Sequence, residues 1–104
     1  MALTKEFKKT VSDRARRDPE FRKALLQEAM NEFLAGDLDT AKIVLRDYIN
    51  ASTQFNRIAK QIHKNDKSVQ RMLSPKGNPT TSNFCLLLNA IQKTEGVTFE
   101  VNIR

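Results

Sequence analysis

The sequence contains few of the residues that interrupt helices or hold a fold together covalently. Its 104 residues include three glycines, three prolines, one cysteine and no tryptophan. Because glycine and proline are the strongest breakers of regular structure, their scarcity favours long helices over many short strands. A single cysteine makes no internal disulfide, and Cys85 together with the single His63 supplies too few soft ligands for a structural zinc site. We therefore expect neither a disulfide nor a bound metal.

Long apolar runs are also missing. The longest one, at 85–88, has four residues, whereas a helix that crosses a membrane needs about 20. The amino terminus lacks the apolar stretch of an export signal, and we expect no membrane partner. Cys85 lies inside the apolar run, and we interpret it as a small, buried hydrophobic residue.

The residues that catalysis requires are not grouped in this sequence. There is no glycine-rich phosphate loop, no constellation of paired carboxylates and no histidine placed to activate Cys85. We therefore expect no enzyme, and no cofactor is implied. The chain is 39% hydrophobic and 29% charged, which is lean in apolar content but unlike a disordered segment. Its length suits one domain over residues 1–104.

The positive charge is concentrated in one part of the chain. The net charge is +6, and residues 53–83 carry six basic residues against the single acidic Asp66. The segments 1–36, 37–52 and 84–104 carry +2, −1 and 0. A basic patch confined to one region of a folded domain is typical of nucleic-acid binding. The alternative interpretation is a solvated cationic face that binds nothing.

Hydrophobic spacing predicts an all-α fold of five to six helices. Asp18 and Pro19 are typical of a helix start, while Gly36 and Gly96 are typical of positions just after a helix end. We divide the domain into N-terminal helices at 1–36, a core at 37–95 and a C-terminal strand at 96–104. Apolar residues recur at helical intervals over residues 4–17, 19–35, 37–51, 52–62, 66–73 and 81–93.

The C-terminal segment has the pattern of a strand. Val97, Phe99, Val101 and Ile103 alternate with polar residues, as in a half-buried strand. Nothing else in the chain resembles a strand, so the backbone groups of this segment need partners from outside. We expect the segment to pair with its copy across a homodimer, with these four residues forming the dimer interface. A disordered tail, or pairing with a different protein, are the alternatives.

Two short predicted helices in the basic window have the spacing of a helix-turn-helix motif. We expect Asp66 to cap the second helix, and Val69, Met72 and Leu73 to anchor it to the domain. The turn between the helices places His63 where a left-handed backbone is needed. The outer face of the second helix would then carry groups that can contact base edges in the major groove, namely Lys67, Ser68, Gln70 and Arg71.

Residues on either side of that helix are candidates for contacts to the DNA backbone. Thr53 and Gln54 lie at the amino end of the preceding predicted helix, where free N–H groups attract phosphate. Lys76, Asn78 and Thr80 lie in the loop that follows the second helix. We expect both sets to hold the backbone that flanks the bases being read.

Several segments resemble the HigA-like addiction module antidote family, whose members are small lambda-repressor-like (Xre-type) helix-turn-helix antitoxins. The resemblance covers nearly the whole chain, and its most specific part is Ser-Pro-Lys-Gly-Asn-Pro-Thr at 74–80. His63 and Lys64 depart from the glycine and apolar residue that the family usually has in the turn. The other matching segments are Asp-Pro-Glu-Phe at 18–21, Leu-Ala-Gly-Asp-Leu at 34–38, Leu-Arg-Asp-Tyr-Ile-Asn-Ala at 45–51, Phe-Asn-Arg-Ile-Ala at 55–59 and 67–73.

This resemblance implies a dimeric, cytoplasmic and nucleoid-associated protein that binds double-stranded operator DNA. It also implies that the protein neutralises a RelE/HigB-like mRNA-cleaving toxin and represses its own operon. The wide apolar face around Phe21, Leu25, Met30 and Phe33 and the basic first helix are both candidate toxin contacts. A free-standing Xre-type repressor is the alternative function, and a helical adaptor that binds no DNA is a further one.

Overall fold

The computed structural model describes residues 5–52 and 55–104, and that part of the chain contains six helices. The first two, α1 (Lys5–Arg17) and α2 (Pro19–Leu34), are separated by the single residue Asp18. The Asp18 side chain accepts hydrogen bonds from the backbone N–H groups of Glu20 and Phe21, at 3.1 and 3.2 Å. It therefore caps α2 as the sequence predicts, with Pro19 at the first helical position where its missing N–H costs nothing.

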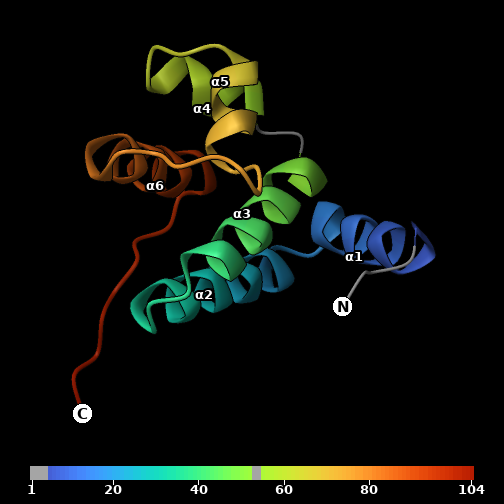
Figure 1. Ribbon diagram of the computed structural model, residues 1–104. Helices are drawn as coiled ribbons and strands as arrows, with labels where there is room; N and C mark the ends of the chain where they lie inside the picture. Colours follow the sequence, from blue (N-terminus) through green and yellow to red (C-terminus); the bar gives the residue numbers. More distant parts are fainter. Residues whose placement is uncertain (1–4, 53–54) are drawn as a thin grey trace.

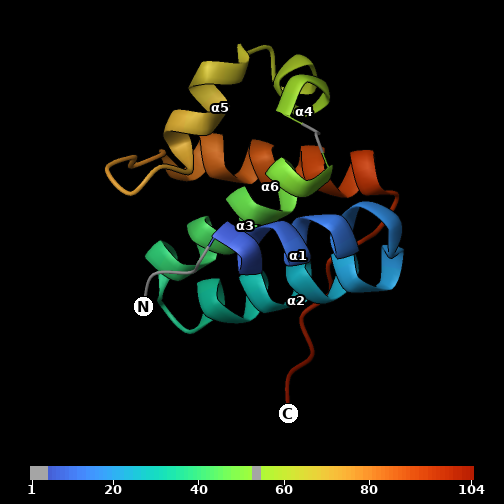
Figure 2. The same cartoon turned by 90° about the vertical axis from the view of Figure 1, so that its right-hand side faces the viewer.

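The remaining helices are α3 (Leu38–Ser52), α4 (Phe55–Gln61), α5 (Asp66–Met72) and α6 (Thr81–Glu95). Helix α3 crosses the middle of the molecule, with α1 and α2 on one side of it (Figure 1). Helices α4 and α5 lie together at the opposite end of the molecule, and α4 also packs on α6 (Figure 2). The prediction of an all-α fold is confirmed.

The core is built from the apolar faces of five of these helices. Helix α3 contributes Leu45, Tyr48 and Ile49, all fully buried, and α6 contributes Leu87 and Ile91. Helices α4 and α5 are anchored to the same cluster by their own apolar residues, while Leu26 and Ala29 come from α2. The short helices therefore gain their stability from packing rather than from their own length.

A polar network joins four helices at one edge of this core. Arg22 of α2 donates to both carboxylate oxygens of Glu95 in α6, at 2.9 and 3.2 Å. Arg22 also donates to the carbonyl of Ala15 in α1 at 2.8 Å, and the Tyr48 hydroxyl of α3 donates to Glu95 at 2.7 Å. The network ties the end of α1 and the end of α6 to the two central helices.

The charge state of this network is set by its hydrogen bonds. Burial acts to raise the pKa of Glu95, but the hydrogen bonds from Arg22 and Tyr48 and the charge of Arg22 outweigh it and hold that pKa below its usual value. Burial, together with the hydrogen bond to Glu95, raises the pKa of Tyr48 above its usual value. Glu95 is therefore a carboxylate, and Tyr48 a neutral phenol, at neutral pH.

The expectation that Cys85 is buried is wrong. Cys85 is exposed rather than buried, and its neighbour Leu86 is 47% exposed. The reason is helical geometry, because four consecutive residues of a helix cannot all face the core. Phe84 and Leu87 occupy the buried side of α6, so Cys85 and Leu86 point away from it.

The strand expected at 96–104 is absent from the chain as described, which has no regular structure from Val97 onward. The segment leaves the end of α6 and runs past α2 with no second strand beside it (Figures 1 and 2). An isolated strand has nothing to pair with, so no ladder forms within one chain. Val97 and Phe99 are half-buried against the core, whereas Val101 and Ile103 are exposed.

Among residues 5–52 and 55–104, no helix is both long enough and apolar enough to cross a membrane.

Candidate nucleic-acid interface

The turn between α4 and α5 is closed by backbone hydrogen bonds at the end of α4. Lys64 N–H donates to the Ala59 carbonyl at 2.9 Å, and His63 N–H donates to the Lys60 carbonyl at 3.3 Å. This pair of bonds is a Schellman motif, which requires a left-handed residue at the position of His63. His63 has φ 57°, so the left-handed backbone predicted for this residue is confirmed.

The residue that caps α5 lies one position before the predicted cap, Asp66. The cap is Asn65, whose side chain accepts a hydrogen bond from Ser68 N–H at 2.8 Å, and Asp66 is the first helical residue. Asp66 still favours the start of the helix, because its charge complements the helix dipole there.

The two faces of α5 separate as expected. Val69 is fully buried, Met72 and Leu73 are nearly so, and they belong to the core cluster. Lys67, Gln70 and Arg71 are exposed, and Ser68 is half-buried. Of the predicted backbone contacts, Lys76, Asn78 and Thr80 are exposed, whereas Thr53 and Gln54 lie outside the described residues.

The loop after α5 is held by a lysine that the sequence analysis did not identify. Lys42 of α3 is only 3% exposed, and its Nζ donates to the carbonyls of Ser74 and Gly77 at 3.1 and 2.6 Å. Because a buried ammonium group needs partners, these two carbonyls and the lysine position one another. The signal in the sequence is weak, since Lys42 lies in an otherwise ordinary amphipathic helix.

Gly77 lets this loop fold back onto the end of α5. A Cβ atom at this position would overlap the carbonyl oxygen of Arg71 and lie 3.0 Å from that of Met72. The Gly77 N–H also donates to the Ser74 carbonyl at 2.9 Å. The close approach to backbone atoms explains a glycine here, although its φ is not in the left-handed region.

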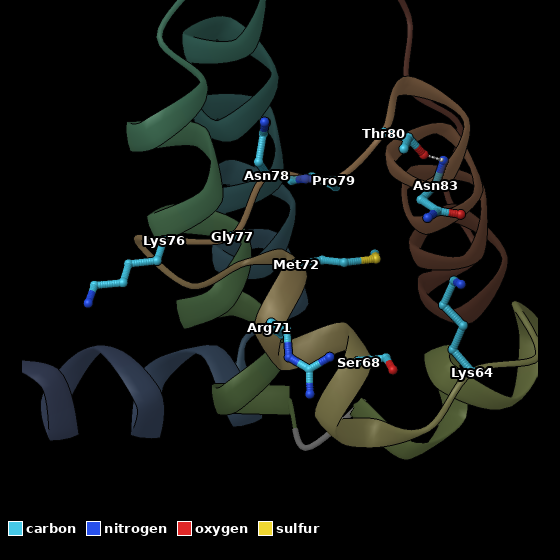
Figure 3. Close-up of a pocket in the computed structure, with 10 residues that line it drawn as sticks. All are labelled: Lys64, Ser68, Arg71, Met72, Lys76, Gly77, Asn78, Pro79, Thr80 and Asn83. Carbon is cyan, nitrogen blue, oxygen red and sulfur yellow. Dashed lines mark hydrogen bonds between the residues drawn. The ribbon is translucent and has the colours of Figure 1, made fainter.

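The loop, the end of α5 and the start of α6 enclose a shallow hollow of about 320 Å³. Figure 3 shows Arg71 and Ser68 on α5, with Thr80 and Asn83 at the start of α6 across from them. Thr80 caps α6, since its hydroxyl accepts from Asn83 N–H at 3.1 Å. The remaining lining residues are Lys64, Met72, Lys76, Gly77, Asn78 and Pro79.

The structure thus brings five of the predicted contact residues into one hollow: Ser68, Arg71, Lys76, Asn78 and Thr80. Lys67 and Gln70 lie on the exposed side of the same helix but do not line it. Lys64 and Asn83 are the residues of this site that the sequence analysis did not assign. Lys64 was visible only as part of the basic window, and Asn83 gave no signal, because its place in the hollow depends on how α6 packs.

Ion pairing distinguishes this region from the rest of the chain. In the described part of the chain, none of the six basic side chains at 53–83 forms an ion pair, and no carboxylate lines the hollow. Elsewhere Arg14, Arg16, Arg22, Lys23 and Lys42 each lie within 4.0 Å of a carboxylate oxygen. The positive potential of the α4–α5 end is therefore not neutralised internally, which favours an anionic polymer as its ligand.

Other kinds of site are not formed by the described residues. Over residues 5–52 and 55–104, no three His, Cys, Asp or Glu side chains are grouped so that they could hold a metal ion.

Comparison of the chain with protein-family models, curated proteins and solved structures found no match.

Proposed function

We propose that the protein is a sequence-specific DNA-binding antitoxin that acts as a homodimer and represses its own operon. In this proposal α4, the turn at His63 and α5 form a lambda-repressor-like helix-turn-helix, and α5 enters the major groove. The observation that carries the proposal is the exposed, polar and unpaired face of α5, which lies beside a hollow that only cations and neutral groups line. Lys67, Gln70 and Arg71 have the hydrogen-bonding groups that read base edges.

The contacts to DNA divide into two kinds. Lys67, Gln70 and Arg71 would contact bases. The half-buried Ser68 carries a hydroxyl that would contact a base or the nearest phosphate. Lys76, Asn78 and Thr80 would hold the flanking phosphates, and Thr53 and Gln54 remain candidates for further phosphate contacts. Since phosphate contacts release counterions, the affinity should fall steeply as salt is added.

The toxin partner is supported by the resemblance of the sequence to HigA-like antidotes. The basic helix α1, on which Arg14, Arg16 and Arg17 are exposed, is the candidate contact surface. We propose a RelE/HigB-like toxin as the partner, encoded beside this chain. Co-expression with the product of the neighbouring reading frame tests this part, because a free-standing repressor would leave that product unbound and its toxicity unchanged.

The DNA-binding part is tested with the double variant Gln70→Ala/Arg71→Ala. Both side chains are exposed, so the fold should be unchanged, as circular dichroism can verify. Loss of two base contacts at about 1–3 kcal/mol each predicts at least about a 30-fold weaker affinity for the DNA upstream of the gene. The measurement is fluorescence anisotropy with a labelled duplex, in excess non-specific competitor DNA.

Arg17→Ala is the matched control, because it removes the same charge from an exposed position at the end of α1. Its affinity should remain within about twofold of the wild type, since a remote charge acts only through the overall field. Wild-type affinity in the double variant would refute the assignment of α5 to the major groove.

A further inference from the structure

The C-terminal segment, residues 97–104, presents one free hydrogen-bonding edge. Val97 N–H donates to the Gln92 carbonyl at 3.0 Å, and Phe99 N–H donates to the Gln92 side-chain oxygen at 2.8 Å. In an extended segment, alternate N–H groups point to the same side. The N–H groups of Val97 and Phe99 are engaged with Gln92 of α6. If an extended backbone continues this alternation, the N–H groups of Thr98, Glu100 and Asn102 would face away from α6.

This alternation restricts how the segment can pair with a copy of itself. In an antiparallel pair, residues that exchange both backbone hydrogen bonds alternate with residues that exchange none. Thr98, Glu100 and Asn102 must be the hydrogen-bonded residues, because the other edge is turned toward α6. The two-fold axis must then pass between one residue and the same residue of the second copy. The registers to compare are those centred on Phe99, Glu100, Val101 and Asn102.

The side chains separate these registers. Centring on Glu100 puts two carboxylates directly opposite each other, which is unfavourable. Centring on Phe99 would place Gly96 opposite Asn102 and Glu95 opposite Ile103, so that the second copy would run into the end of α6. Centring on Asn102 leaves Phe99 with no residue of 97–104 opposite it.

Centring on Val101 removes each of these problems. Glu100 then lies opposite Asn102 of the second copy and diagonal to both Arg104 and Glu100 of that copy, so that no two carboxylates lie directly opposite each other. Phe99 lies opposite Ile103 of the second copy, which is an aromatic and β-branched pair. This pair also gives Ile103 a place to be buried, although Ile103 is 96% exposed in the single chain.

A hollow beside Phe99 lies where the Ile103 side chain of the second copy would pack. It measures about 990 Å³ and lies between α2, α6 and the C-terminal segment. Phe99 and Val101 line it together with Met30, Phe33 and Leu34 of α2. A two-stranded ribbon alone is only marginally stable, so it needs an apolar surface to pack on, and these residues supply one.

We propose that two copies of this chain pair through residues 98–104 as an antiparallel ribbon centred on Val101, with Ile103 of each copy packed beside Phe99 of the other. The inference rests on the homodimer of the proposed function and adds its register. The second copy is the favoured occupant because this register pairs the exposed Ile103 with Phe99 and sets no two carboxylates directly opposite each other.

The test is disulfide cross-linking of the full chain in a Cys85→Ser background, since Cys85 is exposed and would react. Val101→Cys should cross-link rapidly under mild oxidation, because residues opposite themselves in a non-hydrogen-bonded pair have Cα atoms about 4.5 Å apart. Glu100→Cys and Asn102→Cys are the matched controls. Their Cβ atoms would lie about 7–8 Å from their own copies, so they should cross-link at least about tenfold more slowly.

Each outcome decides something different. Fastest cross-linking by Glu100→Cys or Asn102→Cys would overturn the register and leave the homodimer intact. A dimer in light scattering that none of the three cysteines cross-links would overturn pairing through this segment. A monomer at all concentrations would refute the homodimer itself, and cross-linking only to a co-expressed different protein would assign the edge to that partner.

Discussion

Glu95 is the residue on which the polar network depends, because it accepts hydrogen bonds from both Arg22 and Tyr48. Its side chain is 9% exposed and that of Arg22 is 18% exposed. We predict that Glu95→Gln lowers the free energy of unfolding by about 1–3 kcal/mol at pH 7, since Arg22 is left without its counter-charge. Urea denaturation followed by circular dichroism measures the change.

The same variant also has a predicted pH dependence. Because the pKa of Glu95 is lowered in the folded protein, its stabilising contribution is present above the unfolded-state pKa and is lost as the pH falls through the folded-state pKa. The difference between wild type and Glu95→Gln should therefore shrink in acid. Glu20→Gln serves as a control, because its carboxylate is 83% exposed and its pair with Lys23 is worth little. A difference that stayed constant down to about pH 2 would contradict the role given to the charge.

At the residue scale, local rules predicted what depends on neighbours in sequence. Asp18 caps α2, and His63 adopts a left-handed backbone, because each requirement arises within one turn of chain. The same rules placed Cys85 in the core, and this was wrong because burial depends on which face of α6 meets the rest of the fold. Lys42 and Gly77 were not recognised as a pair, because their contact joins residues 35 positions apart.

At the scale of elements, the segment from α5 to α6 depends on α3 through Lys42. We predict that Lys42→Met lowers the free energy of unfolding by about 2–3 kcal/mol, because the carbonyls of Ser74 and Gly77 lose a charged donor. The loop that carries Lys76, Asn78 and Thr80 would then be held less well. We expect operator affinity to fall about tenfold under conditions in which the variant is still folded.

Lys93→Met is the control for this change, because it removes the same charge from an exposed position on α6. It should leave stability within about 0.5 kcal/mol of the wild type. If folded Lys42→Met bound the operator as tightly as the wild type, the loop would contribute nothing to the interface.

The helices were predictable to within a few residues because each carries its own hydrophobic period and end signals. The start of α4 is the least well tested, because the predicted start at Ser52 or Thr53 adjoins residues 53 and 54, which lie outside the described residues. Ser52 itself belongs to α3, and α4 is described from Phe55. The tail at 97–104 has the alternation of a strand but forms none within one chain. Alternation describes which face is apolar, whereas a strand also needs a neighbour to supply hydrogen bonds.

At the scale of the whole molecule, the charge distribution was the most reliable guide to the candidate site. The basic window at 53–83 is one continuous stretch of sequence, and its described residues, 55–83, form α4, α5, the following loop and the first residues of α6 (Figure 2). The hollow beside α5 was not predictable in the same way. It needs Asn83 of α6, and the position of α6 is fixed by long-range packing of residues such as Phe84 and Leu87.

The proposed dimer and the proposed DNA interface together predict how operator geometry affects binding. Two copies related by a two-fold axis would place their α5 helices on one face of the duplex, about one helical turn or a multiple of it apart. Inserting about five base pairs between the half-sites rotates one half-site to the opposite face. We predict that this insertion weakens binding at least about 100-fold, to the level of a single half-site, because only one α5 can then engage.

An insertion of about ten base pairs restores the facing of the half-sites but lengthens their separation, so it distinguishes rotation from distance. The same duplexes should then be compared using a chain that lacks residues 97–104. If the tail joins the two copies, the truncated chain binds every spacing with the same half-site affinity, because its copies bind independently. Retention of the spacing dependence by the truncated chain would place the dimer contact elsewhere on the molecule, and the anisotropy measurement with each duplex decides between the two.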